Sequence, residues 1–340
     1  MNEAKQSYQQ QFFERLSTRF TSRSALVQAV AEDLHVGRDA VYRRLRGDTA
    51  LTADEMMHLA AIYQLRTDLG GSSKERVPSL RYPEDRRPIT NEFDHFVQLH
   101  SRWEQLKRLP GASFDLASPE LPIYYELSTP VLRAFKIFMF GITTWNLAKW
   151  KHLDFSTDLI DASLHRLVED TIRDHYSIPA RELWSIGVLD VTLRQVNYMA
   201  QIGKFADPKD QERIFIELHK IVDHLEAMVR TGKRFPLGEG PGPRSTDFRV
   251  YHNELSNTSN VVLVKSRLRP FLFTTLVNPN YVATSDRELC EEAQQWFDNL
   301  VEHGNALHAE AGKYAAQYFG YLRGLIRHHE QRSKVGHSVF

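Results

Sequence analysis

The chain contains 340 residues, and its 43 Lys and Arg side chains balance 43 Asp and Glu side chains, so the formal net charge is zero. A neutral chain has no overall electrostatic attraction for nucleic acid or an anionic membrane, so any such contact needs a local basic patch. The single cysteine excludes an internal disulfide, and the N-terminus lacks an apolar signal segment. The most apolar stretch, 131–150, is interrupted by Arg133 and Lys136, which excludes a membrane span. We therefore expect a cytoplasmic protein of about two domains.

Residues 22–65 predict three short helices separated by tight turns. Apolar residues at helical spacing predict the first helix over 22–34, followed by a short break. A second helix over about 37–46 ends at Gly47, because glycine commonly terminates helices. The Thr52–Glu55 capping box then opens the third helix. This order of elements is typical of a helix-turn-helix domain.

Residues 30–47, VAEDLHVGRDAVYRRLRG, resemble the helix-turn-helix of Xre/Cro-type bacterial transcriptional regulators. Two positions depart from the family pattern. His35 stands where the turn usually has Gly, and Arg44 stands where an apolar residue is usual, with Leu45 one residue later. Three further segments resemble the long uncharacterised C-terminal domain of a group of such regulators, namely 177–205, 248–264 and 278–300.

The resemblance implies that the second helix lies in the major groove of double-stranded DNA and contacts base edges. If Val41 and Leu45 face inward, five of its side chains face the DNA: Arg38, Asp39, Tyr42, Arg43 and Arg46. Arginine suits this role because its guanidinium can bond guanine O6 and N7 together. Two more arginines are predicted phosphate contacts, Arg23 and Arg44, and Arg44 is alternatively an intramolecular partner because it neighbours the buried face. Seven arginines against three acidic residues between 15 and 46 make a local basic patch.

The helix-turn-helix domain is predicted over 1–68, and a Pro-, Gly-, Ser- and charge-rich linker over 69–90. From 91 to 330, helical periodicity dominates, with helices expected over 93–106, 131–150, 159–176, 179–205, 208–230, 287–303 and 311–329. Strand-like character over 113–127 and three candidate strands within 247–277 predict a small antiparallel sheet. A polar tail follows over 331–340. The predicted fold class is therefore mainly α, a helix-turn-helix bundle with a larger helical domain and a small antiparallel sheet.

We expect a homodimer, because one recognition helix contacts too few bases for a specific complex. The large domain is expected to dimerise and to sense a small-molecule effector of unknown identity, without a cofactor or metal and without catalytic activity. The alternative is a protein-interaction module or an enzyme in the large domain, with the N-terminal helices recruiting a partner. Recognised catalytic and phosphate-loop motifs are missing from the sequence.

His219, Asp223 and Glu226 share a helical face and are ligand types for zinc, although a solvated polar face gives the same pattern.

Overall fold

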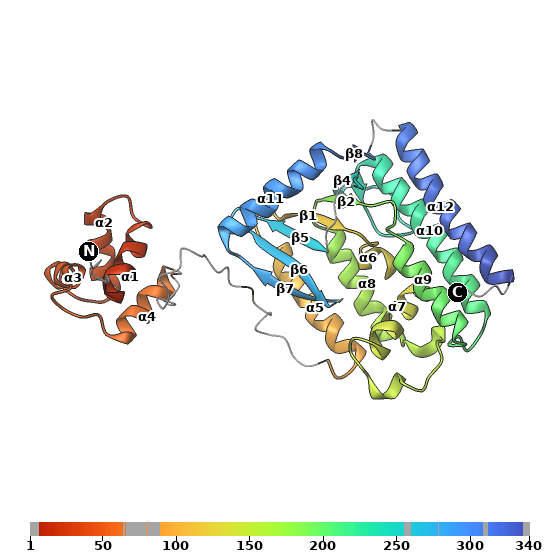
Figure 1. Ribbon diagram of the computed structural model, residues 1–340, viewed down its shortest axis with the longest axis horizontal. Helices are drawn as coiled ribbons and strands as arrows, with labels where there is room; N and C mark the ends of the chain where they lie inside the picture. The colour runs from red at the N-terminus through yellow and green to blue at the C-terminus, as the bar shows by residue number, and fades with distance from the viewer. Residues whose placement is uncertain are drawn as a thin grey trace, which may run out of the picture. The chain divides into compact units, whose positions relative to one another are not determined.

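The structure is a computed structural model that describes residues 7–63, 65, 80, 89–254, 260–277, 279–308 and 312–335. The chain divides into two compact units, Met1–Val77 and Pro78–Phe340, which are treated separately below (Figure 1). The division falls within the segment 69–90, which the sequence predicts as a linker, and most of that segment lies outside the described residues.

The described residues of the first unit form four short helices: α1 (Tyr8–Ser17), α2 (Arg23–Asp33), α3 (Arg38–Arg46) and α4 (Ala53–Ile62). Helices α1, α2 and α4 each begin at a hydroxyl side chain that accepts a hydrogen bond from a first-turn backbone amide, Ser7, Ser22 and Thr52 respectively. The predicted capping box of Thr52 and Glu55 is confirmed. The helices enclose a small apolar core, which includes Phe12, Phe13, Leu16, Leu26, Val27, Val30, Val41 and Leu59.

A mixed sheet of eight strands runs through the second unit (Figure 1). Its middle consists of three mutually parallel strands in the order β4-β2-β1, namely β4 (Thr246–His252), β2 (Ala180–Trp184) and β1 (Ser113–Ser118). An antiparallel meander continues from β1 through β5 (Val261–Lys265), β6 (Phe271–Val277) and β7 (Asn280–Thr284). Two short strands pair with β4, namely β3 (Lys233–Arg234) and β8 (Asn305–Ala306).

The predicted fold class, mainly α with a small antiparallel sheet, is wrong, because the second unit is an α/β fold with a large mixed sheet. The strand-like segments 113–127 and 247–277 do contain β1, β4, β5 and β6. The decisive error concerns 180–184, which the sequence places inside a helix over 179–205 but which forms β2. Ala, Arg, Glu and Leu favour helices, yet pairing on both sides with β1 and β4 outweighs that local preference.

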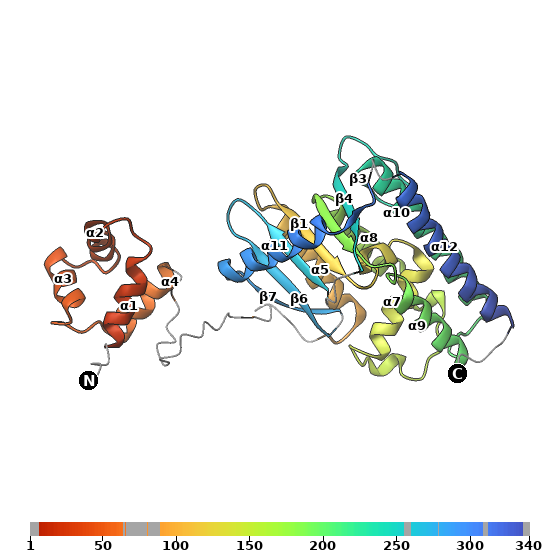
Figure 2. The same cartoon turned by 45° about the horizontal axis from the view of Figure 1, so that its top comes forward.

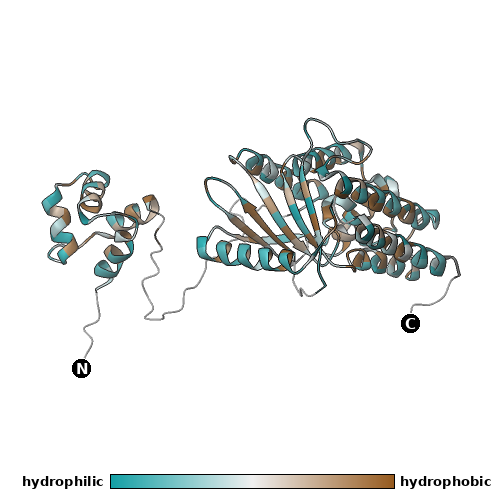
Figure 3. Ribbon diagram, turned by 90° about the horizontal axis from the view of Figure 1, so that it is seen from above, coloured by the Kyte–Doolittle hydropathy of each residue, from teal (hydrophilic) through white to brown (hydrophobic). Residues whose placement is uncertain are grey.

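Helices cover both faces of this sheet (Figures 2 and 3). The large core fills one face, and Phe114 and Leu116 of β1 point into it. On the other face, Ala117 and Leu183 pack against Phe297 of α11 (Arg287–Glu302). The large core is completed by α5 (Glu92–Lys107), α7 (Pro130–Ile142), α8 (Ala162–Tyr176), α9 (Asp190–Gln201), α10 (Lys209–Thr231) and α12 (Gly312–Val335). Short helical turns are α6 (Ile123–Glu126), η1 (Ala148–Trp150) and η2 (Thr157–Leu159).

Several predicted helices of the second unit are confirmed within a few residues, namely α5, α8, α10, α11 and α12. The helix expected over 131–150 instead ends at Ile142, and the chain continues through loops to η1. Helix α12 runs to Val335, so the first half of the predicted tail 331–340 is helical and the rest lies outside the described residues. Within the described part of the chain, no helix combines the length and the apolar character that crossing a bilayer requires.

Candidate nucleic-acid interface

A four-residue turn, Leu34 to Gly37, joins α2 to α3. His35 in this turn has a φ of 52°, in the left-handed region. The Val36 amide donates a hydrogen bond to the Ala31 carbonyl at 3.0 Å, and the His35 amide donates to Glu32 at 3.2 Å, which closes the end of α2. Residues 23–46 therefore form a helix, a tight turn and a second helix.

The backbone of His35 makes the turn a site of local strain, because a Cβ atom in the left-handed region costs roughly 1–2 kcal/mol. Replacing His35 by Gly should therefore stabilise the first unit by about 1 kcal/mol. The measurement is hydrogen exchange of the full-length protein, followed by mass spectrometry of peptides from 23–46. Amides that exchange only when this unit unfolds should exchange about fivefold more slowly in His35→Gly than in the wild type. His35→Ala, which keeps the Cβ atom, is the matched control and should give no such protection. Equal protection in both variants would contradict the account of strain.

The two sides of α3 differ in burial. Val41 is fully buried and Leu45 is half-buried against the core, as the sequence predicts. The structure places the five predicted DNA-facing side chains on the remaining side of this one helix, with Tyr42 half-buried and the other four exposed: Arg38, Asp39, Tyr42, Arg43 and Arg46.

The exposed arginines of α3 differ in how they are held. The Arg38 guanidinium donates to the Ser24 hydroxyl at 3.2 Å. Arg46 donates to Asp48 at 2.8 Å, and both side chains of this pair are about half exposed (56% and 51%), so the pair is weak in water. The Arg43 side chain makes neither a hydrogen bond nor an ion pair with any residue that the structure describes. Arg43 is therefore the α3 cation most available to an external partner.

Arg44 is turned away from that side of α3. Its guanidinium donates to Glu55 of α4 at 2.8 Å, and its side chain is only 13% exposed. Burial alone would raise the pKa of Glu55. Hydrogen bonds from Thr52 and Arg44 together have a larger, opposite effect, so the pKa of Glu55 lies below its ordinary value. This geometry favours a role for Arg44 in joining α3 to α4, and its contact with phosphate stays a prediction.

Arg23 occupies the first turn of α2 and is exposed. That turn contains no acidic residue. Because the amide groups at a helix N-terminus carry partial positive charge, an arginine beside them adds to a region that favours phosphate oxygens. The position suits the predicted phosphate contact of Arg23.

Two polar side chains, Gln9 and Tyr63, make contacts with α3 and α2 that were not apparent from the sequence. The Gln9 amide donates to the carbonyl groups of Arg44 and Thr49 at 2.7 and 2.8 Å, and its oxygen accepts from the Leu51 amide at 2.8 Å. The Tyr63 hydroxyl donates to Asp33, and burial together with this carboxylate raises the pKa of Tyr63 to about 12. Such contacts join residues some 30 to 42 positions apart, and periodicity carries no signal for them.

On α10, the two carboxylates of the zinc-ligand pattern, Asp223 and Glu226, are already paired with an arginine. Arg323 of α12 donates to Asp223 at 2.7 Å and also to Glu226. His219 lies on the same helix, but the two carboxylates beside it are held in this ion-pair network. The pattern therefore belongs to helix packing between α10 and α12.

Comparisons of the chain with protein-family models, with curated proteins and with solved structures found no match.

Proposed function

We propose that the protein is a sequence-specific DNA-binding transcriptional regulator in which α3 is the recognition helix. The observation that carries the proposal is the exposed side of α3, where Arg38, Arg43 and Arg46 follow a tight turn and the opposite side is anchored in the core. A rigid helix that presents arginines at this spacing suits the major groove, which admits one α-helix.

Exposed arginines of the first unit are not confined to α3. Arg15 and Arg19 near the end of α1 and Arg23 at the start of α2 are also exposed. Exposed arginines attract phosphates without regard to sequence, whereas arginines in the groove select guanine. We therefore assign Arg43 and Arg46 to base contact first, with Arg38 and Tyr42 next, and Arg23 to the phosphate backbone.

The proposal includes a homodimer, with the second unit as the region that dimerises and responds to a small-molecule effector. A single helix-turn-helix contacts few base pairs, and two copies on paired half-sites about one helical turn apart supply the remaining affinity. The expected operator is thus an inverted repeat.

The test is selection of genomic DNA fragments by purified full-length protein at about 0.15 M salt. The wild type should enrich a short motif, and the Arg43→Ala/Arg46→Ala variant should not. Arg287→Ala is the matched control, because Arg287 is an exposed arginine (86% for its side chain) on α11 of the second unit. On the selected site, Arg43→Ala should weaken binding by about 1–3 kcal/mol and relax the preference at one base pair. An equal loss on every sequence would identify Arg43 as a phosphate contact instead.

A protein-interaction module is the second candidate, and the Arg46–Asp48 ion pair favours it because it reduces the positive charge beside α3. Asp39 lies on the same exposed side. If neither the wild type nor the double variant enriches any DNA, with or without cell extract as a source of effector, the DNA-binding proposal fails and this second candidate takes precedence.

A further inference from the structure

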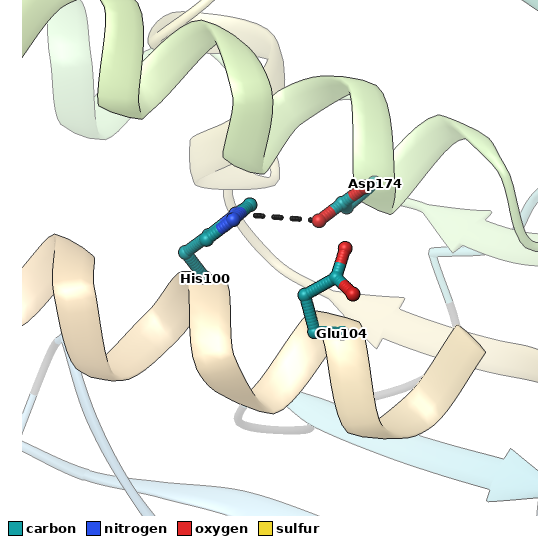
Figure 4. Close-up of side chains that lie close together, drawn as sticks. All are labelled: His100, Glu104 and Asp174. Atoms are coloured by element: carbon teal, nitrogen blue, oxygen red, sulfur yellow. Dashed lines mark ion pairs between the residues drawn. The ribbon is translucent and has the colours of Figure 1, made fainter. Parts of the chain in front are cut away.

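Three side chains with metal-ligand chemistry meet between α5 and α8 of the second unit (Figure 4). His100 and Glu104 lie four residues apart on α5, so they occupy the same face of the helix. Asp174 reaches them from the last turn of α8. The imidazole nitrogen and one oxygen of each carboxylate all lie within 4.8 Å of one another.

The His100–Asp174 contact is the unusual part of this cluster. Asp174 is nine-tenths buried, with 9% of its surface exposed. His100 Nδ1 and Asp174 Oδ2 face each other at 3.2 Å, both atoms are shielded from solvent, and neither has a hydrogen-bond partner within the described residues. Figure 4 marks this contact as an ion pair, and a metal ion between the two atoms would take both the ring nitrogen and the carboxylate oxygen as ligands.

A cation of the protein already lies beside the two carboxylates. The Lys107 ammonium contacts Asp174 Oδ1 at 2.5 Å and also contacts Glu104. Lysine offers three hydrogen-bond donors, and Lys107 directs its ammonium at Glu104 and Asp174, whereas a metal ion also binds the lone pair of an imidazole. Lys107 sits at the end of α5 with 30% of its side chain exposed, so its flexible chain has room to turn toward solvent.

We propose that His100, Glu104 and Asp174 form a binding site for a divalent transition-metal ion of the zinc class, with Lys107 as the built-in competitor for that position. One imidazole and two carboxylates are ligand types that zinc accepts, and their number matches the three protein ligands that leave a fourth position open in catalytic zinc sites. The imidazole selects against Mg²⁺, which prefers an all-oxygen shell. The two carboxylates offset the charge of the ion, which replaces the lysine ammonium between them.

The test is equilibrium titration of chelator-treated, full-length protein with Zn²⁺ against a competing zinc indicator. The wild type should bind one ion that His100→Ala weakens by about tenfold or more, since loss of an outer partner alone typically costs about 10–100-fold. Lys107→Gln, which removes the competing charge and keeps a polar side chain, should tighten binding about tenfold. His219→Ala on α10 is the matched control and should leave the titration unchanged.

The same variants, titrated with Co²⁺, supply a spectroscopic readout, because imidazole loss in His100→Ala should alter the visible ligand-field bands of the bound ion. Mg²⁺ should not compete with Zn²⁺ at equal concentration. Zinc affinity that is the same in the wild type, His100→Ala and Lys107→Gln would overturn the proposal and leave the cluster as an ion-pair network. Neither result depends on DNA binding, so this proposal and the proposed function fail or succeed separately.

Discussion

Replacing Arg234 by Met should destabilise the second unit by about 3–5 kcal/mol, because it leaves a buried carboxylate without its compensating charge. Arg234 is 1% exposed, and Glu182 is fully buried with an Oε1 atom 3.9 Å from the guanidinium. The pKa of Glu182 is raised by burial, and the positive charge of Arg234 opposes that rise. Without Arg234, the carboxyl group must either stay charged in the core or take up a proton.

The surroundings of Arg234 explain why so large an effect is expected. Its guanidinium lies 4.8 Å from the ring centre of Phe114 and 5.3 Å from that of Tyr176. It also donates to the carbonyl oxygens of His175 and Ile178 at 2.8 and 2.7 Å. Burial and the nearby Arg234 hold the pKa of His175 well below its ordinary value, so the ring is neutral and contributes no second charge. One side chain thus joins the aromatic core, the end of α8 and strand β2.

The measurement is urea unfolding followed by tryptophan fluorescence, which reports on the second unit because all five tryptophans lie beyond residue 77. Arg181→Met is the matched control. Arg181 also pairs with a buried carboxylate, Asp115, but is 29% exposed, and Lys265 keeps a second cation 2.7 Å from that carboxylate. Arg181→Met should therefore lower the free energy of unfolding clearly less than Arg234→Met does. The double variant Arg234→Met/Glu182→Gln should recover part of the loss, and a loss under about 1 kcal/mol in Arg234→Met would contradict this account.

Arg181 and Glu182 show why strand β2 could not be predicted from the sequence. In the sequence, Arg181 and Glu182 are charged residues in a stretch of helix formers, and they favour an exposed helix. In the fold, Arg181 faces Asp115 and Asp298, and Glu182 accepts hydrogen bonds from Tyr125 and Trp184. Each partner comes from a different part of the chain except Trp184. Charges that are paired with long-range partners leave no periodic signal in the sequence, and the fold class depends on β2, the strand that contains them.

The helices of the first unit could be predicted from the sequence more closely than β2, because their ends and faces depend on residues that are near one another in the chain. The Thr52–Glu55 capping box, the glycine at the end of α3 and the inward side of Val41 follow from spacings of three or four residues. The five candidate DNA contacts share one side of α3 for the same reason. The zinc-class cluster was missed because only His100 and Glu104 share a helix, while Asp174 lies 70 residues beyond Glu104.

Gly141→Ala should destabilise the second unit by about 3 kcal/mol, although alanine normally favours a helix. Gly141 lies near the end of α7, and a Cβ atom there would stand 2.1 Å from Cε3 of Trp150. Trp150 is 2% exposed, and its ring stacks on Phe138 with centroids 5.9 Å apart. Because the ring is buried and packs against Phe138, it has little room to move, so α7 and η1 must separate.

Gly320→Ala on α12 isolates the cause of this effect. Gly320 is also a helical glycine, but it is exposed, and an added Cβ atom would meet nothing within 4 Å. Its replacement should therefore raise the free energy of unfolding by about 0.5–1 kcal/mol, since only the loss of glycine's chain entropy remains. Opposite signs for the two variants, measured in the same tryptophan-detected urea unfolding, would establish that contact with Trp150 decides the outcome at Gly141. If both variants were more stable than the wild type, the ring of Trp150 would give way to the added methyl group, and this account of Gly141 would be wrong.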